Sequence, residues 1–140
     1  MFKYLRTLNT EFHPTVVEFF VSPTNEAIPD SIEKGILCSL NNSYLSCFYS
    51  PDKPMYLSLG TKREDETKKV KCMRLSSGMV LEADVTEGAD KSQLGIGSLA
   101  CLGYDIDTKV VGVSTGDDLK KFEVIDNSNI ENNKVTVVII

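Results

Sequence analysis

Short apolar runs alternate with turn residues along the whole chain, which is the pattern of a protein built from β-strands. In 79–85 every second residue is apolar, and the acidic Glu82 and Asp84 lie between, so one face is buried and the other is wetted. Strand-like runs rich in β-branched and aromatic residues occupy 15–21, 36–40, 44–49, 55–59, 70–75, 79–85, 98–102, 109–113, 120–125 and 134–140. The pattern predicts an all-β fold, a compact antiparallel β-barrel or sandwich of about nine or ten short strands.

Helical periodicity is nearly absent, and at most one or two short helical turns are expected. One candidate is 29–34, which Gly35 would end. Two hairpins are predicted, where Asn41-Asn42-Ser43 and Ser76-Ser77-Gly78 separate consecutive strands. The apolar run at 134–140 would promote aggregation if left exposed, so it should pair centrally in its own barrel or against a neighbour.

A chain of 140 residues has the size of one domain, and 15–140 is predicted to be a single β-barrel-like domain. Segment 62–69 is charged at seven of its eight positions, which predicts an exposed loop. Segment 1–14 instead carries apolar side chains without turn residues: Phe2, Tyr4, Leu5, Leu8 and Phe12. It is either an extended arm that binds a partner through these five residues or an edge strand of the same barrel, because its pattern fits both.

Composition excludes several classes of protein. Hydrophobic residues make up 41% of the chain and charged residues 25%, which argues against a disordered chain. The net charge of −5 opposes nonspecific binding to nucleic acids and anionic membranes. No apolar run has the length of a membrane-spanning helix, and the first residues lack the apolar stretch of a signal peptide, so synthesis in a cytoplasm is expected.

Candidate chemistry is sparse. The only histidine, His13, precedes Pro14 and is interpreted as structural, because a general base usually needs a partner that orients it. Gly95-Ile96-Gly97 lacks the third glycine of a dinucleotide-binding fingerprint and is interpreted as a turn. The acidic residues at 105–107 and 117–118 do not match a calcium loop and are interpreted as solvated turn residues.

The cysteines have no metal-ligand or disulfide spacing. Cys38, Cys47, Cys72 and Cys101 form no C-x-x-C pair, and each has apolar neighbours. They are predicted to be four reduced, buried thiols. The sequence therefore predicts no catalytic residue, no cofactor and no metal, and a protein that is not an enzyme.

The order of strands and turns resembles that of the small β-barrel decoration proteins (also called cement or head auxiliary proteins) that coat the capsids of tailed bacteriophages. The resemblance covers most of the chain after residue 14. It rests on the glycine-led hairpin at 34–45, the proline-containing strand at 52–57, the paired runs at 70–85 and the closing runs at 121–126 and 134–139.

This resemblance implies a non-enzymatic virion structural protein, assembled in the host cytoplasm and located on the outer capsid surface. Its partner would be the major capsid protein, whose subunits it would bridge and stabilise, and it could also contact itself as a small homo-oligomer. Two alternatives stay open: a small β-barrel module that binds a protein or ligand in a cell, and an accessory barrel domain of an enzyme complex.

Overall fold

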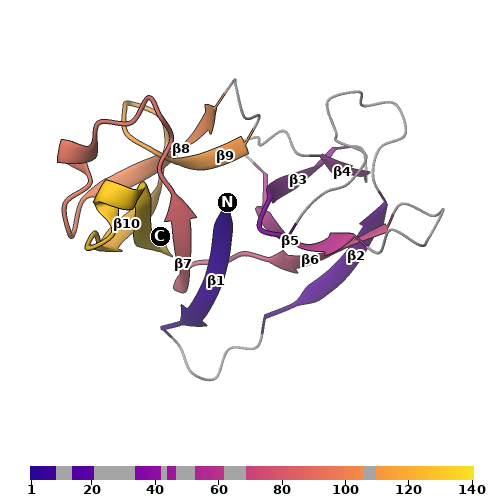
Figure 1. Cartoon of the computed structure of the whole chain (residues 1–140). Helices are drawn as coiled ribbons and strands as arrows, with labels where there is room; N and C mark the ends of the chain where they lie inside the picture. Colours follow the sequence, from indigo (N-terminus) through magenta and orange to yellow (C-terminus); the bar gives the residue numbers. More distant parts are fainter. Residues whose placement is uncertain (9–13, 21–33, 42–43, 47–52, 62–68, 106–109) are drawn as a thin grey trace. The chain divides into compact units, whose positions relative to one another are not determined.

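The computed structural model describes residues 1–8, 14–20, 34–41, 44–46, 53–61, 69–105 and 110–140. These residues form eleven β-strands and two short 3-10 turns, η1 (Lys91–Gln93) and η2 (Ile130–Asn132) (Figure 1). The strands pair antiparallel in two sheets, so the prediction of an all-β fold is confirmed. The chain divides into two compact units: unit 1 is Met1–Phe12 with Ser76–Ile140, and unit 2 is His13–Leu75.

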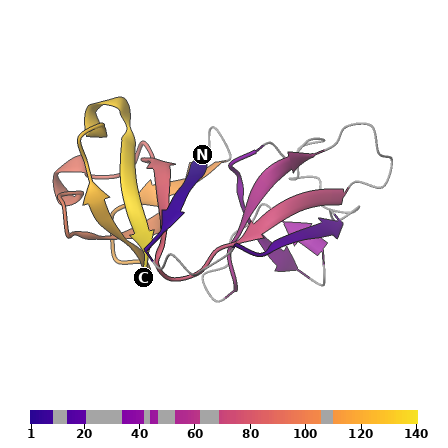
Figure 2. The same ribbon diagram turned by 90° about the horizontal axis from the view of Figure 1, so that it is seen from below.

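Unit 1 contains a six-stranded sheet in the order β1-β7-β11-β10-β8-β9. Its strands are β1 (Phe2–Thr7), β7 (Met79–Asp84), β8 (Leu99–Asp105), β9 (Val110–Ser114), β10 (Lys120–Asp126) and β11 (Lys134–Ile139). The apolar strand β11 pairs on both sides, with β7 and with β10, as its composition demands. An isolated parallel bridge joins Val85, just after β7, to Val113 in β9, so the strongly twisted sheet curls toward a barrel (Figure 2).

Inward-pointing side chains of successive strands form the core of unit 1. Leu81, Val137 and Val124 are paired across β7, β11 and β10, and all three are fully buried. Phe2 of β1 is 3% exposed, and its ring stacks on that of Phe122 with 6.0 Å between the centroids. Because burying such a side chain contributes about 1.5–3 kcal/mol, β1 is an integral strand of this unit.

Two glycines face each other where the barrel of unit 1 closes, since Gly103 of β8 pairs with Gly112 of β9. A Cβ atom on Gly112 would lie 2.8 Å from the backbone oxygen of Asp84 and 3.1 Å from the Thr86 methyl carbon. At the same point the Thr86 N–H donates a hydrogen bond of 2.9 Å to the carbonyl of Val113. The missing side chain therefore lets residues 84–86 approach β9 closely enough to bond.

Unit 2 contains a five-stranded sheet in the order β2-β6-β5-β3-β4. Its strands are β2 (Val16–Phe20), β3 (Leu37–Asn41), β4 (Tyr44–Ser46), β5 (Tyr56–Thr61) and β6 (Lys69–Arg74). Strand β5 is irregular between Ser58 and Thr61, where Gly60 has φ of 108°, a conformation that glycine adopts without the steric cost of a side chain.

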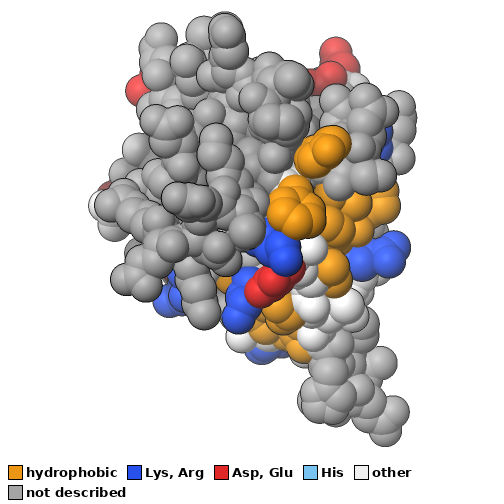
Figure 3. Space-filling view, turned by 90° about the vertical axis from the view of Figure 1, so that its right-hand side faces the viewer, with side chains coloured by type: hydrophobic (Ala, Val, Ile, Leu, Met, Phe, Trp, Pro, Cys, Tyr) orange, Lys and Arg blue, Asp and Glu red, His pale blue; other side chains and the backbone are white. Residues whose placement is uncertain are grey.

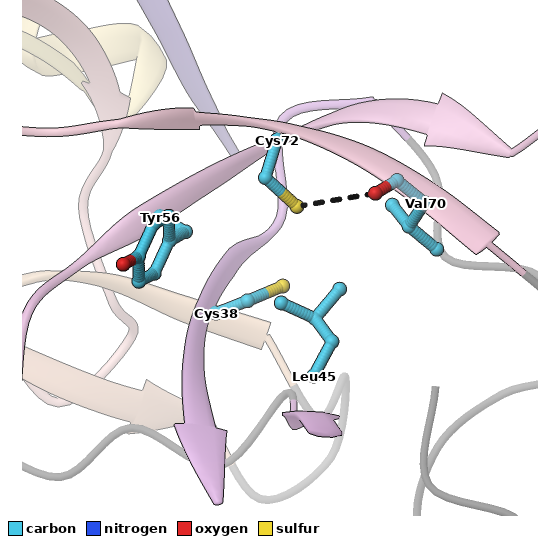
Figure 4. Close-up of a cluster of buried hydrophobic side chains, with 5 residues drawn as sticks. All are labelled: Cys38, Leu45, Tyr56, Val70 and Cys72. Carbon is cyan, nitrogen blue, oxygen red and sulfur yellow. Dashed lines mark hydrogen bonds between the residues drawn. The ribbon is translucent and has the colours of Figure 1, made fainter. Parts of the chain in front are cut away.

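The core of unit 2 is small and rich in sulfur (Figure 4). Cys38, Leu45, Tyr56, Val70 and Cys72 pack together from four strands, and all five are buried. The Cys72 thiol points toward the carbonyl of Val70, 3.9 Å from it. Phe19 of β2 packs edge-on against Tyr56, with 5.0 Å between ring centroids and an interplanar angle of 77°. These contacts make both cysteines small hydrophobic core residues.

The predicted hairpins have different outcomes. Leu40 pairs with Leu45 in the β3–β4 ladder, so the first hairpin is confirmed, although turn residues 42–43 lie outside the described residues. The second hairpin is wrong, because β6 pairs with β2 and β5 whereas β7 pairs with β1 and β11. Gly78 does turn the chain, with φ of 86°, but it turns between two units rather than within one hairpin.

The single domain over 15–140 stays a prediction. The chain divides into two compact units, and β1 belongs to the same unit as residues 76–140. Of the two alternatives for segment 1–14, an arm or an edge strand, residues Phe2–Thr7 form a strand. The predicted helical turn at 29–34 and the charged loop at 62–69 lie outside the described residues, apart from Lys34 and from Lys69, which begins β6.

Candidate functional site

The outer surface of two neighbouring strands in unit 2 combines apolar and charged side chains. Strand β2 alternates exposed and half-buried residues, and its register with β6 places three pairs on the outer side. We call this surface the β2–β6 face, and it consists of Val16, Glu18, Phe20, Lys69, Lys71 and Met73. Figure 3 views the side of the molecule on which β2 lies in Figure 1, where apolar side chains (orange) lie beside basic (blue) and acidic (red) ones.

Apolar side chains on the β2–β6 face remain accessible. Val16 is 52% exposed and Phe20 is 49% exposed, whereas Phe19 between them packs on the core of unit 2. Strand β2 is an edge of its sheet and pairs regularly with β6, without a bulge. An exposed valine and phenylalanine on one regular edge strand are a surface that can take up a further apolar contact.

Charge on the β2–β6 face is predominantly basic. The Lys69 ammonium lies 5.0 Å from the centre of the Phe20 ring, a cation–π contact. Lys71 Nζ lies 4.0 Å from Glu18 Oε1, and both side chains are about half exposed, so this ion pair contributes at most about 1 kcal/mol. Two ammonium groups thus stand against one carboxylate, which favours an acidic partner for this face.

The five side chains of the predicted partner-binding arm have different environments. Phe2 is buried in unit 1, and the Tyr4 hydroxyl forms a hydrogen bond of 3.0 Å with Thr7 Oγ1. Leu5 and Leu8 are exposed, at 42% and 58%, and Phe12 lies outside the described residues. Because Phe2 anchors β1 to its own barrel, Leu5 and Leu8 are the exposed ones among those of the five side chains that the structure describes.

Strand β1 also carries features that protect a sheet edge from pairing with another chain. Its register with β7 shifts between Tyr4 and Arg6, so Leu5 sits in a bulge, and Lys3 and Arg6 are exposed. Bulges and basic residues are the common devices that prevent edge-to-edge association. Edge strands β1 and β2 therefore differ, and β2 is the less protected of this pair.

A charged cluster lies at the end of β7, beside a cleft of about 220 Å³ in unit 1. Lys134 Nζ donates to Asp84 Oδ1 at 2.8 Å, and the amino group of Met1 contacts the other carboxylate oxygen. Partial burial raises the pKa of Asp84, but the hydrogen bonds from Lys134 and Met1 outweigh it and the pKa is lowered overall. Asp84 thus stays ionised at neutral pH. A general acid must carry a proton, so the role that fits Asp84 is that of an ion-pair partner.

The described cysteines are buried thiols, as predicted for Cys38, Cys72 and Cys101, and Cys47 lies outside the described residues. Burial raises the pKa of Cys101, whose thiol donates to the carbonyl of Ser114 at 3.4 Å. A raised pKa reduces the thiolate fraction, so this cysteine is a poor nucleophile.

The other residues singled out in the sequence are not brought together. Asp105 ends β8, Asp117 and Asp118 lie in an exposed turn, and Gly97 has φ of 86°, as the turn interpretation requires. Within the described ranges, no group of three or more His, Cys, Asp and Glu side chains could hold a metal ion. No helix in the described part of the chain has the length and apolar character needed to cross a membrane. His13 and Asp107 lie outside these ranges.

Comparison of the chain with protein-family models, with curated proteins and with solved structures finds no match. The candidate site therefore rests on geometry. The β2–β6 face was not identified from the sequence. Lysines alternate with apolar residues at 69–72, but 16–20 is apolar at four of its five positions, so the pattern does not show which of its residues face outward. What the pattern lacks is the information that these two distant segments are neighbours in one sheet.

Proposed function

We propose that the chain is a structural protein that acts by binding another protein through the β2–β6 face, and that its partner is the major capsid protein of a tailed bacteriophage. The observation that carries the binding role is this face, where exposed Phe20 and Val16 lie next to Lys69 and Lys71. Aromatic side chains are enriched at the centre of protein interfaces, whereas lysines are depleted there and suit the polar rim, so Phe20 would be covered and the two lysines would border the contact. The capsid as partner rests on the resemblance of the strand and turn pattern alone. The all-β fold is compatible with that resemblance, but the runs at 70–85, which are one of its motifs, do not pair with each other.

The expected energetics suit a contact that is repeated many times on a shell. Val16 and Phe20 are each about half exposed, so covering them would contribute about 1 kcal/mol each before ordering costs. A contact of this size is weak for a single molecule. Effective concentration would strengthen it where linked copies of the chain bind neighbouring capsid subunits at the same time.

The test is to sediment particles from the source culture through a density gradient and to probe the fractions with an antibody against the chain. We expect the chain to band with capsids in many copies per shell. A variant carrying Val16→Ser and Phe20→Ser should bind stripped shells more weakly than a matched variant carrying Leu5→Ser on β1 and Leu8→Ser just after it. Circular dichroism would confirm that both variants are folded.

Two results would refute parts of this proposal. If the chain stays with free proteins at the top of the gradient and crosslinks to a cellular protein, the capsid is the wrong partner and a cellular binding module is the better description. If both double variants bind shells as the parent does, the β2–β6 face is the wrong surface.

A further inference from the structure

The formal charge of the chain is divided unequally between its two units. Unit 1 has twelve acidic and seven basic residues and carries the whole net charge of −5, whereas unit 2 has eight of each and is neutral. Within the described strands of unit 2 the balance is basic, with Glu18 as the sole acidic residue against Lys69, Lys71 and Arg74. The β2–β6 face is therefore a basic surface on an acidic protein.

One end of unit 1 is a surface of opposite charge. The N–H of Asp90 donates to Thr115 Oγ1 at 2.8 Å, which ties loop 86–90 to the turn at 115–119. We call this region the acidic end, and it presents the exposed residues Glu87, Asp90, Asp117, Asp118 and Leu119. Two lysines adjoin it: Lys91 is exposed, and Lys120 donates to the carbonyl of Gly116. Four carboxylates against two ammonium groups leave the region acidic.

We propose that the β2–β6 face of one copy of the chain binds the acidic end of unit 1 of a second copy. Each surface places an apolar residue among charges: Phe20 is 49% exposed on the face, and Leu119 is 59% exposed on the acidic end. Opposite charges steer such surfaces together, whereas two β2–β6 faces would set lysines against lysines. The contact joins two different patches, so repeating it from copy to copy builds closed rings or open chains.

This association is a property of the purified chain, and it does not depend on whether the external partner is a capsid. Because both contacts use the β2–β6 face, a copy bound to the external partner through this face does not bind a second copy through it. Because its attraction comes from exposed charges, it weakens as salt shortens the Debye length from about 10 Å at 0.1 M to about 3 Å at 1 M. We expect the dissociation constant to rise roughly tenfold or more over that range.

The experiment is sedimentation velocity on the full chain, as a concentration series at low and at high salt. Lys69→Glu with Lys71→Glu should abolish self-association. The matched control, Lys3→Glu with Arg6→Glu on β1, changes the net charge equally and should leave self-association in place. Asp117→Lys with Asp118→Lys should also abolish it, with Glu123→Lys and Glu131→Lys as the charge-matched control.

Mixing the two defective variants gives the sharpest result. The reversed face of one variant is complementary to the reversed acidic end of the other, so the mixture should associate although neither variant does alone. A chain that stays monomeric at low salt up to its solubility limit would overturn the proposal. Self-association of equal strength at low and high salt would also overturn it. So would loss of self-association in the control variants as complete as in the test variants, or a mixture of the two defective variants that does not associate. Binding of an acidic peptide to a chain that remains monomeric would assign the face to another occupant.

Discussion

Replacing Gly112 by alanine tests the closure of the barrel in unit 1. The added methyl carbon would lie 2.8 Å from the backbone oxygen of Asp84, which is not the movable tip of a side chain. Either β9 or residues 84–86 must move, and the hydrogen bond from the Thr86 N–H to the Val113 carbonyl lies at the same place. The added methyl carbon cannot avoid this contact by shifting toward Thr86, because the Thr86 methyl carbon would be only 3.1 Å away.

Overpacking of this kind destabilises the folded state by about 1–3 kcal/mol. Alanine also lowers the conformational entropy of the unfolded chain, which stabilises the folded state by about 0.4–1 kcal/mol. We therefore expect a net loss of about 1–2 kcal/mol in the free energy of unfolding. In a unit of fewer than 100 residues each kcal/mol lowers the melting temperature by roughly 4–8 °C. Calorimetry measures this, and hydrogen exchange of the Thr86 amide reports the opening locally.

Gly88→Ala is the matched control, because a Cβ atom there meets nothing within 4 Å and φ is not in the left-handed region. That variant should be as stable as the parent or slightly more stable. This prediction is refuted if the Gly112→Ala variant melts at the same temperature as the Gly88→Ala variant and its Thr86 amide is equally protected from hydrogen exchange. Residues 84–86 would then not approach β9 closely, and Gly112 would not be needed to close the barrel.

Four further predictions concern other parts of the chain. The lowered pKa of Asp84 and the raised pKa of Lys134 mean that their pair stabilises unit 1 above the ordinary pKa of aspartate and below that of lysine. Lys134→Met should thus reduce stability by at most about 1 kcal/mol between roughly pH 5 and 9, and a loss that persists when Asp84 is protonated would contradict the pairing. Phe2→Ala should destabilise unit 1 by about 3–5 kcal/mol in denaturant titration, and a small effect would mean that β1 is not packed on Phe122. In a Cys47→Ser variant no thiol should react quickly with a disulfide reagent until denaturant is added, and a fast thiol would show that Cys38, Cys72 or Cys101 is accessible. Replacing residues 9–77 by Asn-Gly should leave a folded unit 1 with a sharp thermal transition, and a molten product would show that unit 1 depends on unit 2.

Strand positions followed from the sequence because short runs rich in apolar and β-branched residues are separated by turn residues. The predicted run 120–125 became β10 (Lys120–Asp126), and 134–140 became the central strand β11 (Lys134–Ile139). Local turn chemistry also identified the β3–β4 hairpin, whose strands are close in sequence. Such information is short-ranged, and it specifies an element and its inward face without specifying its neighbours.

Pairing between distant segments could not be predicted, and the candidate site depends on it. Val16 pairs with Met73, and Phe20 with Lys69, across about fifty residues of chain. The same limitation produced the incorrect hairpin at Ser76-Ser77-Gly78, since β6 and β7 are consecutive, similar in pattern and separated by a good turn. A turn sequence fixes a change of direction, and it does not fix whether the strands on either side share a sheet.

The topology explains why one domain was expected and two units are found. The N–H of Leu8, just after β1, donates to the carbonyl of Gly78, just before β7, at 2.9 Å. The chain therefore leaves unit 1 and returns to it at a single point, and unit 2 takes the place of the turn that would otherwise join β1 to β7 in a hairpin. An insertion of this kind leaves β1 and β7 far apart in the sequence although they pair directly in the sheet. Only that pairing reveals the insertion, because the hydrophobic pattern of a strand does not specify its neighbours.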